Sequence, residues 1–275
     1  MFLPEAGRWA GTAAFPAAVL SASAFILAGV LANQTAYLFF WEGDRAAHSV
    51  LYWTMMAGGS SFLPAVAYCL YSLPAAGMYA EDYRSGAAYM RIQRMGCTRY
   101  ALGRVIHTAA SAGLCACLAE AAAVLALTAG FGVPLLLGED VAQLQQSFGW
   151  STLLRQGSGY GFFLTVFLRR IMGAVFYALA AAAFSAFVAD RQVVLALPLL
   201  YWYFNQYVLV SMEWVPEWLQ PRLLYETDYR GGISSLSDWQ WAWTAAGATL
   251  AAAAAVFLLL RLRLAKNGIF GGGDG

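Results

Sequence analysis

Residues 241–260 read WAWTAAGATLAAAAAVFLLL, a run of twenty residues without a charged side chain. The hydrocarbon core of a bilayer is about 30 Å thick, and a helix needs about 20 apolar residues to cross it. Backbone polar groups find no water in lipid, so a helix is favoured over an isolated strand. This run therefore predicts a membrane-spanning helix.

Similar apolar runs recur along the chain. They predict an all-α, polytopic membrane protein, built as a single transmembrane domain with six transmembrane helices. Pro64 and Pro74 predict kinks in the second span, and the apolar stretch 160–168 could begin the fourth span earlier. The expected spans are residues 11–32, 52–77, 105–129, 171–188, 193–210 and 241–260.

The composition of the chain fits lipid as its solvent. Of 275 residues, 61% are hydrophobic and 11% are charged, whereas soluble domains carry about 25% charged residues. A net charge of +1 argues against nucleic-acid binding, because no excess of positive charge faces phosphate. With two histidines, one lysine and no Walker A pattern, the sequence predicts neither a histidine-rich metal site nor enzymatic activity, ATP hydrolysis included.

The arginines set the expected orientation. If both termini are cytoplasmic, more arginine and lysine residues lie on the inner side than on the outer side, in accord with the positive-inside rule. The cytoplasmic loop is then 78–104, and the outer loops are 33–51, 130–170 and 211–240. We expect a multi-pass protein of the bacterial plasma (inner) membrane.

The strongest local signal is the arginine-rich segment 78–104. It reads MYAEDYRSGAAYMRIQRMGCTRYALGR and contains five arginines. Glu81 and Asp82 suit the N-terminal end of a helix, where the helix dipole favours negative charge. Thr98 could cap the helix that enters the third span. The pattern predicts two short cytoplasmic helices set at an angle.

Such helices would present both charge and apolar groups to a soluble partner. Arg91 and Arg94 would lie one turn apart, and Tyr83, Tyr89 and Met90 accompany them in the sequence. A positive anchor on anionic membrane lipid would also explain the charge, but it would leave the apolar side chains unexplained. Partner docking is therefore the favoured interpretation, and lipid contact is the alternative.

At this segment the chain resembles the ABC-2 class of ABC transporter permeases. An acid and a glycine precede an R-x-x-R-x-G-x-T-R-x-x-x-x-R stretch that enters the third of six spans. The insert 213–230, in which Trp214 and Trp218 recur at helical spacing, resembles the outer re-entrant helices of that family and predicts a short amphipathic helix. Residues 1–10 could form its interfacial elbow helix. The matching residues are Glu81, Gly86, Arg91, Thr98, Arg99 and Tyr100.

The resemblance implies a permease subunit that works with partners. It would pair with a second copy or with a sister permease in the lipid, and would bind an ABC ATPase subunit that holds ATP and Mg. This chain would hold no cofactor of its own. The implied function is export of a hydrophobic or amphipathic substrate. The implied ATPase-coupling loop comprises Glu81, Asp82, Tyr83, Arg84, Gly86, Arg91, Arg94, Arg99 and Tyr100.

The resemblance has two departures. Gly96 and Cys97 stand where a proline often precedes the arginine, and the loop after the third span is long. Both departures concern features that would identify the subfamily and the transported substrate.

Glu120 is the one acid well inside a predicted span, and such a carboxylate is a functional candidate by default. Small residues on the same helix face direct it towards protein. It could be a proton or substrate contact, or a packing group that is protonated or hydrogen-bonded. Asn205 and Gln206 in the fifth span could line a substrate path or make interhelical hydrogen bonds.

An ion-coupled secondary transporter with Glu120 as its proton site is the alternative function. The lack of an inverted repeat and of a second buried acid weighs against it. Arg169 and Arg170 are expected to mark the outer end of the fourth span, with their charges at the lipid headgroups. A role for these arginines in meeting an anionic substrate is the less favoured interpretation.

An intramembrane hydrolase is the third candidate. Residues 157–161, GSGYG, have the outline of a nucleophile loop around Ser158. The serine would need a base beside it. His107 is expected across the bilayer, and His48 is expected in a different outer loop with no acid to orient it.

Overall fold

The computed structural model describes most of the chain as helix. Within the described ranges every regular element is helical and no strand occurs, so the predicted all-α fold class is confirmed. The interfacial helix predicted at residues 1–10 lies outside these ranges, as do Trp214 and Trp218. The described residues are 14–40, 48–59, 63–130, 132–148, 151–188, 190–209, 211–212, 215, 220–225 and 236–266.

Among the described residues, three helices are long and apolar enough to cross a membrane. The first is α7 (Cys97–Leu125), which continues as the π-helical turn η1 (Ala126–Gly130). The others are α10 (Gly159–Ser185) and α13 (Asp238–Lys266). These helices correspond to the third, fourth and sixth predicted spans, and the protein is accordingly a helical membrane protein.

The other three predicted spans have a different form. The first falls on α2 (Ala14–Phe40), of which Ala14–Val30 is apolar but shorter than the three long spans. The second is divided into α3 (Val50–Gly59) and α4 (Leu63–Ser72). The fifth consists of α11 (Arg191–Phe204) and the π-helical turn η2 (Asn205–Leu209). A count of six spans stays a prediction.

The second predicted span contains α3 and α4, and residues 60–62 between them lie outside the described ranges. The kink predicted at Pro64 adjoins these residues. Pro74 lies in the turn at residues 73–77 that follows α4, so helix ends at Ser72 and does not continue to residue 77 as predicted.

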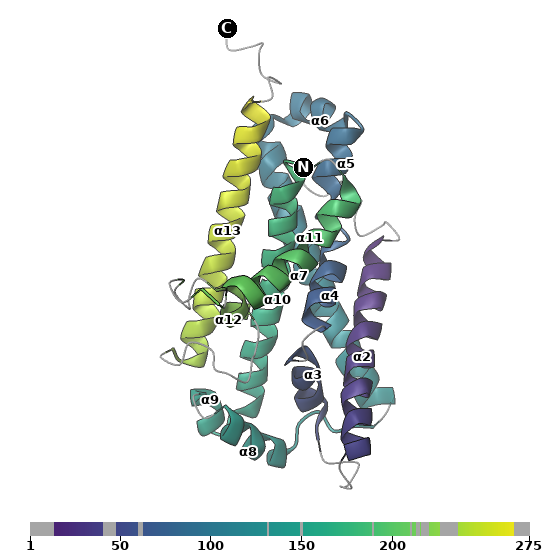
Figure 1. Cartoon of the computed structure of the whole chain (residues 1–275), viewed down its shortest axis with the longest axis vertical. Coiled ribbons are helices and arrows are strands. Elements are labelled where there is room, and N and C mark those ends of the chain that lie inside the picture. Colours follow the sequence, from purple (N-terminus) through teal and green to yellow (C-terminus); the bar gives the residue numbers. More distant parts are fainter. Residues whose placement is uncertain are drawn as a thin grey trace.

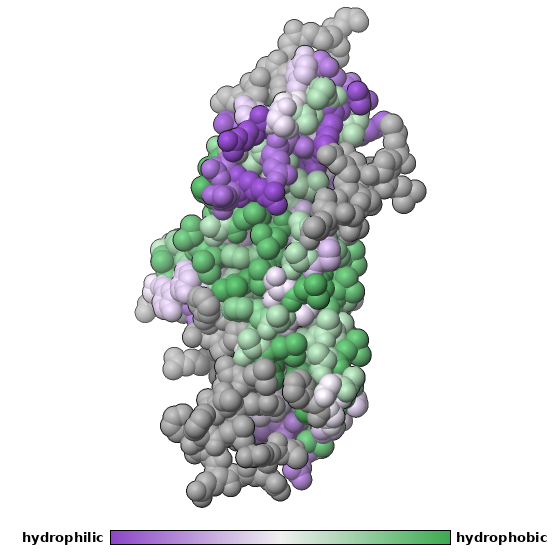
Figure 2. All heavy atoms as spheres, turned by 90° about the vertical axis from the view of Figure 1, so that its right-hand side faces the viewer, coloured by the Kyte–Doolittle hydropathy of each residue, from purple (hydrophilic) through white to green (hydrophobic). Residues whose placement is uncertain are grey.

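The molecule is elongated along its helices (Figure 1). Helices α5 (Met78–Arg84) and α6 (Ala87–Met95) lie at one end, where α2 begins and α13 ends. Helices α8 (Gly138–Ser147) and α9 (Thr152–Arg155) lie at the opposite end. Figure 2 shows apolar surface across the middle and hydrophilic surface at the end that carries α5 and α6. This distribution suits a bilayer around the middle.

The central core joins α2, α4, α7, α10 and α11 through small and aromatic side chains. Small residues let helices approach closely, and the rings of Tyr68 and Tyr177 stack at 4.4 Å where α4 meets α10. Ser23 Oγ of α2 donates a hydrogen bond to the Ala119 carbonyl of α7 at 3.2 Å. Buried members of this core are Ala18, Ala22, Ile26, Ala65, Ala67, Tyr68, Tyr71, Cys115, Ala116, Ala119, Ala123, Ala174, Tyr177 and Trp202.

Between α11 and α13 the short helix α12 (Pro221–Tyr225) lies halfway along the long axis (Figure 1). Leu224 and Tyr225 of α12 are buried together with Trp241 and Ala245 of α13. The Tyr225 hydroxyl shares a hydrogen bond with Thr249 Oγ1 at 3.0 Å. Helix α12 therefore packs against α10 and α13, and most of the insert 213–230 lies outside the described residues.

The close approach of α12 to α10 requires glycine at position 173. A Cβ atom there would lie 2.9 Å from the Tyr225 Cβ and 2.9 Å from the Tyr68 hydroxyl. We expect Gly173→Ala to lower stability by about 1–3 kcal/mol, the usual cost of overpacking. The measurement is the thermal unfolding midpoint of the detergent-solubilised protein.

Gly247→Ala in α13 is the matched control, because nothing lies within 4 Å of its added Cβ. Alanine is the better helix former by about 1 kcal/mol, so this variant should be at least as stable as the parent. Equal midpoints for the two variants would show that α12 does not pack on α10.

Candidate functional site

Two glycines shape the α5–α6 elbow, which we define as residues 78–96. Gly86 separates α5 from α6 with φ of 71°, and Gly96 separates α6 from α7 with φ of 81°. Both values lie in the left-handed region that residues with a Cβ avoid. The two short helices predicted from the sequence are confirmed. Thr98 is not the cap that we predicted, because the turn at Gly96 lets α7 begin at once with Cys97.

Asp82 is the buried centre of the α5–α6 elbow. Its Oδ2 accepts hydrogen bonds from Arg91 Nη1 at 2.5 Å, from the Tyr100 hydroxyl at 3.0 Å, and from Arg104 Nη2. Only 8% of Asp82 is exposed. One carboxylate thus ties α5 to α6 and to the first two turns of α7. A buried ion pair needs several hydrogen bonds of this kind to offset the loss of hydration.

The sequence analysis assigned Asp82, Arg91 and Tyr100 to the same coupling loop. In the structure these three side chains are hydrogen-bonded in one network, and they are directed towards the interior rather than towards a partner. Arg104 completes the network and was not among the predicted coupling residues. Its i,i+4 spacing from Tyr100 was the available signal, because residues four apart share one face of a helix. The Arg104 guanidinium lies 5.1 Å from the centre of the Tyr100 ring.

Beneath the α5–α6 elbow lies an apolar cluster that joins five helices. Ala88 and Ile92 form the buried face of α6, and they belong to this cluster together with side chains of α5, α7, α10 and α13. Burial, with Tyr83 as the next contribution, raises the pKa of Tyr79 to about 12, so this phenol is neutral at physiological pH. The buried members are Tyr79, Ala88, Ile92, Tyr100, Ala101, Val105, Leu179, Val256, Leu260 and Leu264.

The outer face of the α5–α6 elbow is exposed. Tyr83, Tyr89 and Met90 are 49%, 51% and 55% exposed. Exposed large apolar side chains next to charge are typical of interaction surfaces. The exposed arginines of the elbow and the first turn of α7 are Arg84, Arg94 and Arg99.

Glu81 connects the elbow to α11. Its carboxylate accepts a hydrogen bond from Arg191 Nη1 at the start of α11, and both side chains are about half exposed. An ion pair at such an exposed position contributes about 1 kcal/mol or less. The pair orients α5 beside α11 and adds little to stability.

Glu120 pairs with Arg170 in the interior, between α7 and α10. Arg170 Nη1 lies 3.4 Å from Glu120 Oε1, and Arg170 Nη2 donates to the carbonyls of Thr54 and Met55 at 3.1 Å each. Glu120 thus has a partner on α10, and both sequence interpretations, a proton or substrate contact and a packing group, stay predictions. A cavity of about 40 Å³ adjoins the pair, which is room for water.

The prediction that Arg169 and Arg170 mark the outer end of a span is wrong. Helix α10 begins at Gly159, so both arginines lie about three turns inside it. Residues 159–170 therefore belong to this helix and not to an outer loop. Arg169 is 1% exposed, and its guanidinium lies 3.5 Å from the centre of the Trp241 ring. Interior partners hold the charges that we expected at the headgroups.

Asn205 and Gln206 lie at η2, apart from Glu120. Asn205 is 1% exposed and donates a hydrogen bond from Nδ2 to the Tyr177 hydroxyl of α10 at 3.4 Å. Asn205 Oδ1 and Gln206 Oε1 are buried and accept no hydrogen bond from the described residues. Tyr177 is about two turns of α10 from Arg170. The predicted substrate-path residues are thus not joined into one site.

His48 has an acid that orients it, contrary to the sequence prediction. Its Nδ1 lies 2.7 Å from Asp140 Oδ1 of α8, and Asp140 Oδ2 accepts a hydrogen bond from the Ser49 backbone N–H at 2.6 Å. The His48 ring stacks on Tyr52 at 4.2 Å. This cluster joins α8 to the start of α3, and long-range pairing across 92 residues left no local signal in the sequence.

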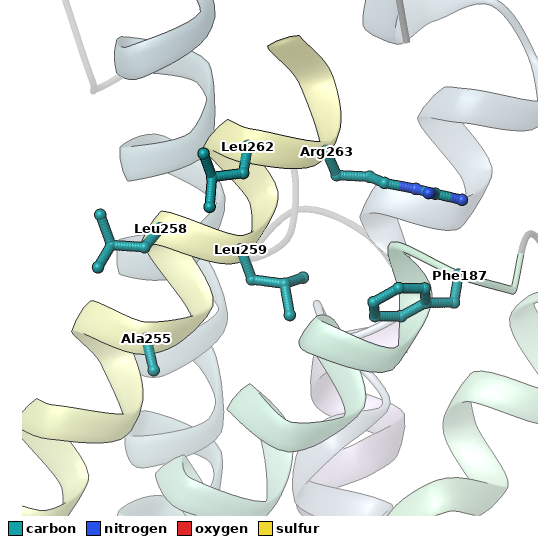
Figure 3. Close-up of a pocket in the computed structure, with 6 residues that line it drawn as sticks. All are labelled: Phe187, Ala255, Leu258, Leu259, Leu262 and Arg263. Atoms are coloured by element: carbon teal, nitrogen blue, oxygen red, sulfur yellow. The ribbon is translucent and has the colours of Figure 1, made fainter. Parts of the chain in front are cut away.

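An open apolar groove of about 500 Å³ lies beside α13 at the end that carries the elbow. Figure 3 shows Leu259 and Arg263 directed from α13 towards Phe187, which follows α10. The Arg263 guanidinium lies 5.4 Å from the centre of the Phe187 ring. Leucines and an alanine form the rest of the lining, which suits an apolar neighbour such as a lipid chain.

Comparison of the chain with protein-family models, with curated proteins and with solved structures finds no match.

The Asp82 network generates a stability prediction. Asp82→Asn leaves Arg91 and Arg104 facing each other without an anion. We expect a loss of up to the roughly 3–5 kcal/mol typical of breaking a buried pair. It would be measured as a lower thermal midpoint and as faster tryptic cleavage within residues 78–104.

Glu81→Gln removes one negative charge from the neighbouring position and serves as the control. Its partner Arg191 is about half exposed and can be hydrated, so we expect a loss of about 1 kcal/mol or less. Equal losses in the two variants would contradict the central role of Asp82.

Proposed function

We propose that this chain is the permease subunit of an ABC-2-type ABC transporter in the bacterial plasma (inner) membrane. It would export a hydrophobic or amphipathic substrate with energy from a separate ATPase subunit. A second permease, identical or related, would complete the transporter. The observation that supports this proposal most is the two-sided construction of the α5–α6 elbow.

The outer side of the elbow has the features of a docking surface. It combines exposed aromatic and sulfur-containing side chains with exposed arginines, and arginine and aromatic residues are enriched at protein interfaces. Lipid headgroups alone would attract the charge and would give no role to Tyr89 and Met90. A soluble protein with an acidic, partly apolar groove matches both features.

The inner side of the elbow has the features of a force-transmitting contact. Ile92 and Ala88 of α6 belong to one apolar cluster with side chains of α7, α10 and α13, which are the three helices of the described residues that are long and apolar enough to cross a membrane. Closely packed interiors are stiff and transmit displacement. Movement of α6 by a partner would therefore move these helices, which is the requirement for alternating access by rigid-body rocking.

Photo-crosslinking tests the docking surface. Tyr89 replaced by p-benzoylphenylalanine, in the full chain in its native membrane, should form an adduct with a protein that carries a Walker A motif. Arg94→Glu should weaken association with that ATPase about tenfold, which equals about 1.4 kcal/mol. The measurement is the amount of ATPase that co-purifies at a series of concentrations.

Arg261→Glu is the control for this experiment, because Arg261 is exposed near the end of α13 and lies outside the elbow. Attraction of a basic surface to anionic lipid or to any acidic protein would be reduced equally by both reversals. A tenfold loss in both variants, or adducts with lipid alone, would overturn the docking role. Arg91 is unsuitable for this purpose, because its reversal disrupts the Asp82 network.

The alternative function, an ion-coupled secondary transporter, is favoured by one observation. Glu120 borders a cavity in the interior, as a proton-binding carboxylate would. Against it, the same carboxylate is paired with Arg170, and the pair links α3, α7 and α10.

Transport measurements separate these two functions. We expect efflux of fluorescent amphiphiles, from cells that express the chain with its ATPase, to stop when ATP is depleted while the proton gradient is held. In Glu120→Gln we expect residual efflux that is still driven by ATP. Efflux that survives ATP depletion in the parent and is lost in Glu120→Gln would favour the secondary transporter.

A further inference from the structure

Arg169 is a buried charge that neither the elbow nor the Glu120 pair uses. It lies about three turns inside α10 and is 1% exposed. The ion pairs of the described residues involve other arginines and His48, and none includes Arg169. An ionisable side chain in the interior of a membrane protein is costly and is therefore a candidate for function.

The contacts of Arg169 leave hydrogen-bonding capacity unused. Its Nε donates to the Thr165 carbonyl at 3.4 Å, which is a long hydrogen bond. Its guanidinium lies over the face of Trp241 at 3.5 Å. Its Nη1 is buried and donates to no described residue. A guanidinium has five N–H donors in a fixed plane, which suits two oxygens of one anion.

The acid nearest in the fold is already engaged. Asp238, at the start of α13, is 2% exposed. Its Oδ2 accepts hydrogen bonds from Ser151 Oγ at 3.1 Å, from Thr152 Oγ1 at 2.9 Å and from the Leu153 backbone N–H at 2.9 Å. Asp238 therefore holds the start of α9 in place and does not form an ion pair with Arg169.

The free-energy balance at Arg169 favours an additional anion. The burial of an ion carries a free-energy cost even after the surroundings relax, and a single cation–π contact offsets only part of that cost. The single long hydrogen bond adds little more. The remaining cost is removed when a carboxylate or phosphate oxygen meets the free N–H groups.

We propose that Arg169 binds the anionic group of an amphiphilic substrate, such as an alkyl phosphate or a fatty acid, within the helix bundle. This inference rests on the proposed transport function and names its substrate class. Trp241 packs with Leu224 and Tyr225 of α12, against Met172 and Phe176 of α10. These apolar walls match a hydrocarbon tail and do not match a small hydrated anion.

Access to Arg169 requires movement of its cover. Trp241 lies over the guanidinium, and α12 packs against Trp241 and against α10 at Gly173, one turn from Arg169. Displacement of α12 or α13 would open the guanidinium to the bundle. Alternating access would supply such a displacement.

Binding to the purified full chain in nanodiscs of zwitterionic lipid tests the proposal without an ATPase. The probes are dodecyl phosphate, dodecanol with the same chain, and inorganic phosphate, each titrated by calorimetry. We expect saturable binding of dodecyl phosphate at least tenfold tighter than that of dodecanol or phosphate. Arg169→Gln should abolish this preference, and Arg169→Lys, which keeps the charge, should retain part of it.

Arg261→Gln is the control, because it removes an exposed arginine outside the site, and it should bind as the parent does. If Arg169→Gln does not fold, the preference of the parent for dodecyl phosphate over dodecanol remains the deciding measurement. Equal binding of dodecanol, equal binding of inorganic phosphate, or an equal loss in Arg261→Gln would overturn the proposal. Failure to find an ATPase partner would overturn the proposed function and leave this binding result intact.

Discussion

The elbow depends on the ion and hydrogen-bond network of one carboxylate. Asp82 accepts from Arg91, Tyr100 and Arg104, so three helices converge on a single oxygen. The network turns a basic loop into a fixed shape, because α5 and α6 alone have seven and nine residues and are too short to be stable as isolated helices. The exposed residues of the elbow keep their positions because this buried group holds the backbone beneath them.

Charged side chains inside the bundle also need partners, and their burial costs more free energy than burial at the elbow. Arg170 is satisfied by Glu120 and by two backbone carbonyls of α3, whereas Arg169 has an aromatic face and one long hydrogen bond. These two adjacent residues of α10 thus contact different neighbours. Arg170 links helices, whereas Arg169 is a buried charge whose hydrogen-bonding capacity is not fully used.

Local features of the chain were predictable from the sequence, because they depend on nearby residues. The apolar runs identified α7, α10 and α13, and the charge pattern identified α5 and α6. The extent of α10 was not predictable from hydropathy alone, because Arg169 and Arg170 interrupt the apolar run. Hydropathy averaged over a window of residues therefore places the end of the span at these arginines. Their partners, Trp241 and Glu120, are 72 and 50 residues away, so only the packed bundle reveals that the helix continues.

Helix α13 combines three of these contacts on one element of 29 residues. Its first residue holds α9, Trp241 covers Arg169, and Leu260 and Leu264 lie beneath the elbow. The helix is continuous and about 40 Å long, so a displacement at one end is transmitted to the other. If the proposed ATPase docks on the elbow, thermodynamic linkage makes the coupling reciprocal: the factor by which an anion at Arg169 changes the affinity for the ATPase equals the factor by which the docked ATPase changes the affinity for that anion.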